Sequence, residues 1–130
     1  MVCLHRYARG SEGLPTLRIS RKLKRSSAGK AHDIERCQQF SHTACGRGPF
    51  YWFRNVGFLQ WSAGAGENLA LGNGGAATAR GTMSDWLNSD GHRAVLLAPE
   101  FDLVGISVAS GEFRGYRGVS IWVAHFGSHG

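Results

Sequence analysis

Long apolar runs are the first feature that this sequence lacks. No window approaches the roughly 18 uninterrupted apolar residues that a membrane-spanning helix requires. The opening residues, MVCLHRYARG, also lack the apolar core of about 7–15 residues that marks a secretory signal peptide. The sequence therefore predicts neither a membrane span nor a signal peptide within these residues.

Common catalytic and nucleotide-binding motifs are also missing. The sequence contains no HExxH, GxSxG, Walker or GxGxxG motif, and no CxxC pair. Without a CxxC pair, a structural zinc knuckle is not expected. Any chemistry must come from residues that the fold brings together, because no contiguous motif supplies it.

Cysteine is scarce, with three residues in the chain. Cys37 and Cys45 flank the segment QQFSHTA, and an oxidising compartment would allow them to form a disulfide. Cys3 would then remain unpaired. Buried or free thiols are the alternative for all three.

Acidic residues are few, with 9 Asp and Glu against 15 Lys and Arg, and the formal net charge is +6. Between Glu12 and Asp33 there is no acid at all, which predicts one basic face. Such a face suits an anionic partner such as a membrane surface, a cell-wall polymer or nucleic acid. A solvated helix face that keeps the protein soluble is the alternative. The basic residues of this segment are Arg18, Arg21, Lys22, Lys24, Arg25 and Lys30.

The chain of 130 residues is long enough for one domain, taken as residues 1–130 with a tail at 128–130. Residues 20–38 predict a helix capped by Ser20, with one face formed by Leu23, Ser27, Ala31 and Ile34. Residues 40–75 are rich in loops, and residues 76–88 predict a second helix before a stop at Gly91.

Residues 101–109 and 117–126 predict two strands of an antiparallel hairpin. Both strands carry apolar residues on both faces, as expected of a sheet that is covered on two sides. The fold class is therefore α+β, with three layers in the order helix, sheet, helix.

Three residues stand out for chemistry. His42 in FSHT and His92 in SDGHR each follow directly on a predicted helix, and Glu67 lies among glycines in GAGENLALG. Rigid elements that project side chains into loops often build functional sites. Glu67 could orient an imidazole, act as a base or bind a metal ion. A structural role for any single histidine remains the alternative.

Taken in order, several segments resemble the bacterial branch of the CAP superfamily, the SCP domains of cysteine-rich secretory, antigen 5 and pathogenesis-related proteins. The resemblance implies an α-β-α sandwich with a central antiparallel sheet. It also implies that His42, Glu67 and His92 converge on one cleft, with a divalent ion such as zinc bound by the two histidines. The segments are LPTLRISRKL, AHDIERCQQFSHTACG, GAGENLALG, MSDWLNSDGHRAVLLAPEFDLVGISV and IWVAHFG.

This chain departs from the family pattern in two places. A second glutamate of the eukaryotic members falls on Ser89, so Asp90 is the candidate substitute in a cleft that also includes Asn68. In the first helix, His5 stands where the family usually has Asn, and the helix is shorter than expected, as if truncated.

The resemblance favours a secreted or cell-wall-associated, monomeric and non-catalytic protein that requires no cofactor. Its expected ligand is an apolar molecule such as a lipid, a cell-wall component or a divalent metal ion. The alternative is a metal-assisted hydrolase or peptidase with zinc on His42 and His92 and Glu67 as base. Two histidines are fewer than the three protein ligands usual for catalytic zinc. Nucleic-acid binding is the least supported class, because only charge and composition favour it.

Overall fold

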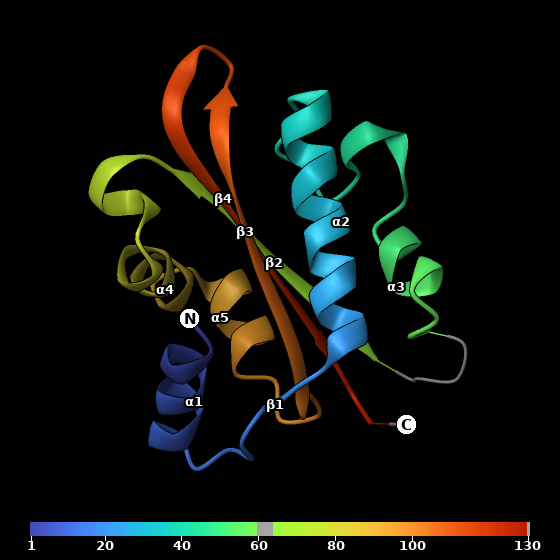
Figure 1. Ribbon diagram of the computed structural model, residues 1–130. Helices are drawn as coiled ribbons and strands as arrows, with labels where there is room; N and C mark the ends of the chain where they lie inside the picture. Colours follow the sequence, from blue (N-terminus) through green and yellow to red (C-terminus); the bar gives the residue numbers. More distant parts are fainter. Residues whose placement is uncertain (60–63, 130) are drawn as a thin grey trace.

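A four-stranded sheet forms the middle of the protein (Figure 1). The computed structural model describes residues 1–59 and 64–129. The strand order is β1-β3-β4-β2, and β1 runs parallel to β3 while the other pairs are antiparallel. The strands are β1 Arg18–Ile19, β2 Ala65–Gly72, β3 Leu103–Phe113 and β4 Tyr116–Gly127.

Helices cover both faces of the sheet, so the predicted α+β class and α-β-α layers are confirmed (Figure 1). α2 (Arg21–Cys37) and α3 (Tyr51–Asn55) lie on one face, and α1 (Val2–Ser11), α4 (Ala79–Leu87) and α5 (Asp90–Leu96) lie on the other. Two 3-10 turns, η1 (Ala44–Gly46) and η2 (Gly74–Ala77), complete the elements. No helix within the described residues is both long and apolar enough to cross a membrane.

The helix α2 packs very closely on the sheet. Ser20 caps its start by accepting a hydrogen bond from the Leu23 amide at 3.2 Å. A Cβ atom added at Gly105 would lie 2.1 Å from the Leu23 backbone, so only glycine permits this approach. The predicted inner face of α2 is confirmed, because Leu23, Ser27, Ala31 and Ile34 are all buried.

The opposite face carries the larger apolar core. Trp86 of α4 is fully buried there and donates its indole N–H to the Leu69 carbonyl at 3.0 Å. Phe101 and Phe126 stack on each other in the same cluster, with ring centroids 5.8 Å apart. Trp86 is therefore part of this core.

Three expectations from the sequence were wrong. The second helix begins at Ala79 and not at residue 76, because Thr78 caps it by accepting from the Gly81 amide at 3.0 Å. Gly91 does not stop a helix but lies inside α5. Lys30 does not belong to an exposed basic face, because its side chain is fully buried.

The segment 40–75, expected to be rich in loops, contains a full strand, β2. Its glycines and the short apolar stretch concealed the alternation that marks a strand. The predicted hairpin is confirmed, although both of its strands extend beyond the expected bounds. Residues 60–63 of the expected loop and residue 130 of the expected tail lie outside the described residues.

Replacing Trp86 tests the packing of this core. We expect Trp86→Ala to lower the free energy of unfolding by about 3–5 kcal/mol, because it leaves a cavity and an unpaired Leu69 carbonyl. Urea unfolding monitored by circular dichroism would measure the change. An exposed substitution on the same helix, Arg80→Ala, should change the free energy by less than about 0.5 kcal/mol. Equal effects of the two variants would contradict the assignment.

His5 makes stability depend on pH. Its imidazole is fully buried against Trp86 and Phe126, and burial lowers its pKa from 6.5 to about 4. Between these two values the unfolded chain binds the proton that the folded protein excludes, so stability falls as the pH is lowered. We expect a loss of about 2 kcal/mol between pH 7.5 and 5 from this group. Urea unfolding should show a smaller loss in His5→Asn, and an unchanged pH slope in that variant would contradict the prediction.

Candidate functional site

Glu67 lies on the edge strand β2, directly opposite His125 of β4, which in turn lies opposite Gly105 of β3. Side chains opposite one another in a sheet point to the same face. The three residues therefore form a row across the sheet, beneath α2. Because Gly105 has no side chain, α2 can pack directly against this row of residues.

Both oxygens of the Glu67 carboxylate are bound by histidines. Oε1 lies 2.6 Å from Nδ1 of His42, and Oε2 lies 2.6 Å from Nε2 of His125. The Glu67 side chain is 7% exposed, and Nζ of Lys30 is 4.0 Å from Oε1. Burial works to raise the pKa of Glu67, but the hydrogen bonds from His125 and His42 and the charge of Lys30 hold it below its ordinary value. Glu67 is therefore ionised at neutral pH.

His125 links this carboxylate to α2. Its ring is fully buried, stacks on Phe53 with centroids 4.2 Å apart, and has Nδ1 2.6 Å from Oγ of Ser26. Burial lowers the pKa of His125 despite the attraction of Glu67, so the ring is neutral at neutral pH. We assign the proton to Nε2, which donates to Glu67, so that Nδ1 is an acceptor. The single proton of the Ser26 hydroxyl then goes to Nδ1 at 2.6 Å in preference to the Leu23 carbonyl at 3.0 Å.

Lys30 of α2 completes the cluster. Its ammonium group donates to the backbone carbonyl of His42 and approaches Glu67. A buried ammonium needs such partners because desolvation of an unpaired charge is costly. Lys30 thereby fixes the backbone that carries His42 and supplies a positive charge to the Glu67 carboxylate.

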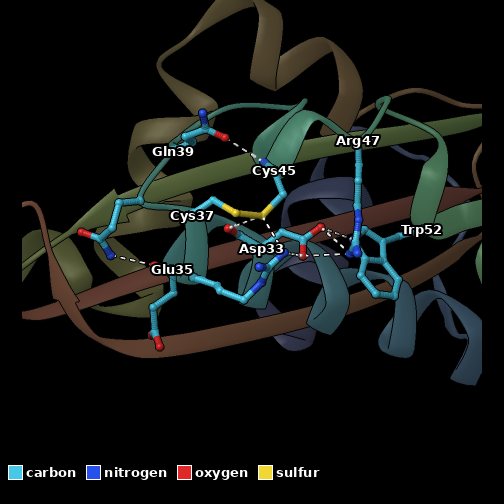
Figure 2. The surroundings of a disulfide bond; sticks show 9 residues. Asp33, Glu35, Cys37, Gln39, Cys45, Arg47 and Trp52 are labelled. Carbon is cyan, nitrogen blue, oxygen red and sulfur yellow. Dashed lines mark hydrogen bonds and ion pairs between the residues drawn. A yellow bond between two sulfur atoms is a disulfide. The ribbon is translucent and has the colours of Figure 1, made fainter.

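A disulfide and a salt-bridged aspartate fix the segment that carries His42 (Figure 2). Cys37 and Cys45 are joined, with Cα atoms 5.5 Å apart, so His42 lies inside a short covalent loop. The Cys45 amide donates to Oε1 of Gln39 at 2.8 Å. At the base of the loop, Asp33 accepts hydrogen bonds from Arg47 at 3.1 Å and from the Trp52 indole at 2.7 Å. These bonds restrict the positions that His42 can take.

The other expected cleft residues lie on the face of the sheet opposite Glu67. Asn68 points to the face opposite Glu67 and donates to the His92 carbonyl at 3.0 Å. Nδ1 of His92 lies 2.9 Å from Oγ of Ser89, and Asp90 is exposed in the first turn of α5. Within the described residues, no hydrogen bond or ion pair joins this group to His42 or Glu67. Metal binding by His42 and His92 together stays a prediction.

Among the described residues there is no group of three or more His, Cys, Asp or Glu residues that could hold a metal ion. His42 nevertheless has the arrangement of a metal-binding histidine, because a carboxylate on one ring nitrogen orients the other as a ligand.

Sequence reasoning missed three members of the cluster: Ser26, Lys30 and His125. His125 lies within a periodic strand and therefore resembles an ordinary core residue, while Lys30 was counted with the basic helix face. One signal was available. Ser26 and Lys30 are one turn apart on the buried side of α2, where polar residues require partners.

An α-β-α sandwich with a histidine–carboxylate cluster beside its edge strand is the class of protein that this structure defines. The sequence profile of the CAP family, the cysteine-rich secretory protein family, matches residues 2–126. The chain belongs to this family.

Several bacterial proteins are similar to it. The chain is 32% identical over 120 residues to Uncharacterized protein YkwD of Bacillus subtilis, and the match covers 91% of this chain and 42% of that protein. The chain thus spans about two fifths of the length of this relative. The fold is similar to that of an outer surface protein from Borrelia burgdorferi, with a TM-score of 0.82 and 21% identity over 98% of this chain and 88% of that chain. An extracellular protein containing a SCP domain from Bacillus anthracis gives a TM-score of 0.78 and 22% identity over 95% of this chain and 37% of that chain.

Removing the charge of Glu67 tests the coupling within the cluster. We expect Glu67→Gln to lower the free energy of unfolding by about 3–5 kcal/mol, because Lys30 remains buried without a counter-ion. The double variant Glu67→Gln/Lys30→Met should be less destabilised than the sum of the single variants. Thermal and urea unfolding of all three proteins would measure this coupling.

A control comes from an exposed ion pair. Glu12 is 51% exposed and pairs with Arg93 at 3.2 Å, so Glu12→Gln should cost less than about 1 kcal/mol. Additive effects of the Glu67 and Lys30 substitutions would show that the two side chains do not interact in the folded protein.

Proposed function

We propose that this CAP domain is a non-catalytic binding module that acts outside the cytoplasm and contacts its ligand through His42. One observation carries the proposal. The His42 side chain is 55% exposed, yet Glu67 holds its Nδ1 at 2.6 Å. An exposed side chain held in one orientation presents its other nitrogen, Nε2, to solvent without the entropy cost of ordering it on binding.

The same contacts argue against catalysis by Glu67. A general base needs a lone pair within hydrogen-bond reach of the proton that it removes and a pKa near the working pH. Both oxygens of Glu67 already accept hydrogen bonds from His42 and His125, and its lowered pKa makes it a weak base. The hydrogen bonds support a positioning role for this carboxylate and not a role as base.

The chain of Ser26, His125 and Glu67 has the residue types of a hydrolase triad, but its burial opposes that role. Ser26 is fully buried on the side of α2 that faces the sheet, so its hydroxyl is not accessible to a substrate. In an active nucleophile the hydroxyl must reach the scissile group. The burial of these residues favours a structural role, in which their hydrogen bonds link the strand β4 to the helix α2.

Among ligand classes, a divalent metal ion suits the ring nitrogens of His42, which is exposed, and His92, which is half-buried. His42 has Nδ1 bound to Glu67, and His92 has Nδ1 bound to Ser89 at 2.9 Å, which leaves Nε2 of each ring as the candidate ligand atom. A bound ion such as zinc would supply a Lewis-acidic contact for further ligand groups. Apolar molecules and cell-wall components are the other ligand classes that family membership suggests.

The proposed location rests on relatives and on the disulfide. Two proteins of similar fold are described as an extracellular protein and an outer surface protein. A disulfide between Cys37 and Cys45 persists in an oxidising environment and is rare in a reducing cytosol. Secretion or attachment to the cell wall is consistent with both observations.

Calorimetry with zinc tests the metal-binding part of the proposal. We expect metal-stripped protein at pH 7.5 to bind zinc in the micromolar range, and His42→Ala and His92→Ala each to abolish binding. His32→Ala is the matched control, because His32 is an exposed histidine on the outer side of α2 and should not affect affinity.

The outcomes separate the alternatives. Loss of zinc binding in His32→Ala would contradict the proposed ligands. So would zinc binding that persists in both His42→Ala and His92→Ala. If no zinc binds while every variant is folded, the metal is excluded and vesicles or cell-wall fragments become the next probes. A hydrolytic activity that is lost in folded Glu67→Gln would instead overturn the non-catalytic role.

A further inference from the structure

One edge of the sheet is only partly covered, on a surface separate from the His42 site. The strand β1 pairs with β3 through two residues, Arg18 and Ile19, which lie opposite Leu103 and Val104. Past these pairs, no strand within the described residues lies on this side of β3. An open strand edge can accept an additional strand from another chain.

The backbone groups that face this edge can be identified from their neighbours. The Val104 carbonyl accepts from the Ser20 amide, and the Ile106 carbonyl accepts from Nζ of Lys24, both at 2.9 Å. In an antiparallel pair, alternate residues direct both N–H and C=O away from the partner strand. Val108 and Ser110 therefore direct their amide and carbonyl groups to the open edge.

Two side chains from the α2 side of the sheet mark the ends of this open segment. At one end, the Lys24 ammonium group donates a hydrogen bond to the Ile106 carbonyl. At the other end, the side-chain amide of Gln38 donates to the Glu112 carbonyl at 3.2 Å. The segment between these caps has room beside it, because a cavity of about 330 Å³ lies between 107–109 and the outer side of α2.

A second cavity, of about 470 Å³, continues from Lys24 past Val104 to Ile19. Lys24 lines both cavities, and we call the two together the β3 groove. Apolar side chains border it at two places, with Val108 48% exposed and Ile19 60% exposed. A groove with apolar walls and free backbone groups suits an extended peptide.

The charge of the β3 groove indicates which peptide fits. Arg21, Lys24 and Arg25 line its wider end, and Arg21 and Arg25 form no ion pair with a described carboxylate. A second copy of this chain would bring the same cations together and raise the repulsion between two proteins of charge +6. Glu35 lines the narrower end beside residues 107–109, so the wider end is the part of the groove that is complementary to carboxylates.

We propose that the β3 groove binds an extended acidic peptide segment of a partner protein as an added β-strand. The backbone of the peptide bonds to Val108 and Ser110, and its carboxylates pair with Arg21 and Arg25. A peptide N–H replaces Lys24 at the Ile106 carbonyl, which frees the Lys24 ammonium for a third carboxylate. Without such a partner, a lysine at an open strand edge hinders nonspecific pairing with strands of other chains.

Fluorescence anisotropy with a labelled synthetic peptide of about seven alternating Glu and Val residues tests the proposal. We expect the protein to bind this peptide and not the equivalent peptide of Lys and Val. Arg21→Glu/Arg25→Glu should weaken binding at least about tenfold. Arg80→Glu/Arg117→Glu is the control, because it changes the net charge equally at exposed positions outside the groove.

A backbone variant separates strand addition from attraction between charges. Val108→Pro removes an N–H that faces the open edge while the bonds from β3 to β4 remain, and it should weaken binding about fivefold. Val108→Thr keeps the N–H and should bind as the parent does. Hydrogen exchange of the parent, which needs no variant, should slow at Val108 and Ser110 when the peptide binds and stay unchanged at Ala109, which faces β4.

Three results would overturn the proposal. The first is no binding of the acidic peptide. The second is binding that Val108→Pro leaves unchanged, with no slowing of exchange at Val108 and Ser110, which would show a purely electrostatic contact. The third is a concentration-dependent dimer that Val108→Pro abolishes, which would assign the edge to a second copy of this chain.

Discussion

The Glu67 carboxylate binds two imidazoles, one on each oxygen, and the arrangement of the elements around it follows from this contact. His125 comes from the neighbouring strand and His42 from the loop after α2. A buried carboxylate is stable only when its hydrogen bonds and charge are satisfied. Lys30 provides the opposite charge, and it reaches Glu67 only because α2 lies against the sheet.

The close approach of α2 has its own requirements in the sequence. At Gly105 any side chain would collide with the helix backbone, and at Gly29 a Cβ atom would lie 2.4 Å from the Trp52 ring. A mid-helix glycine costs about 1 kcal/mol relative to alanine. Here that cost is offset by the contact with Trp52, whose indole N–H also binds Asp33. Gly29 is thus a packing residue.

The site combines a rigid base with an exposed tip. Ser26, His125 and Glu67 form a buried chain between a helix and two strands, whereas His42 is half exposed within the disulfide loop. Side chains that are held on rigid elements lose little entropy when a ligand binds. The β3 groove is different in kind, because its recognition groups are backbone amides and flexible cations.

Features that depend on local pattern follow from the sequence alone. The apolar stripe of α2, its Ser20 cap and the β3–β4 hairpin follow from periods of 3.6 and 2 residues, and the ordered motifs identified the family. The two-sided apolar strands likewise predicted the three layers. The groups that meet Glu67 could not be predicted in this way. Its two histidine neighbours are 25 and 58 residues away along the chain, and their positions depend on strand register and helix packing. For the same reason a buried lysine at position 30 could not be distinguished from an exposed one until α2 was placed on the sheet.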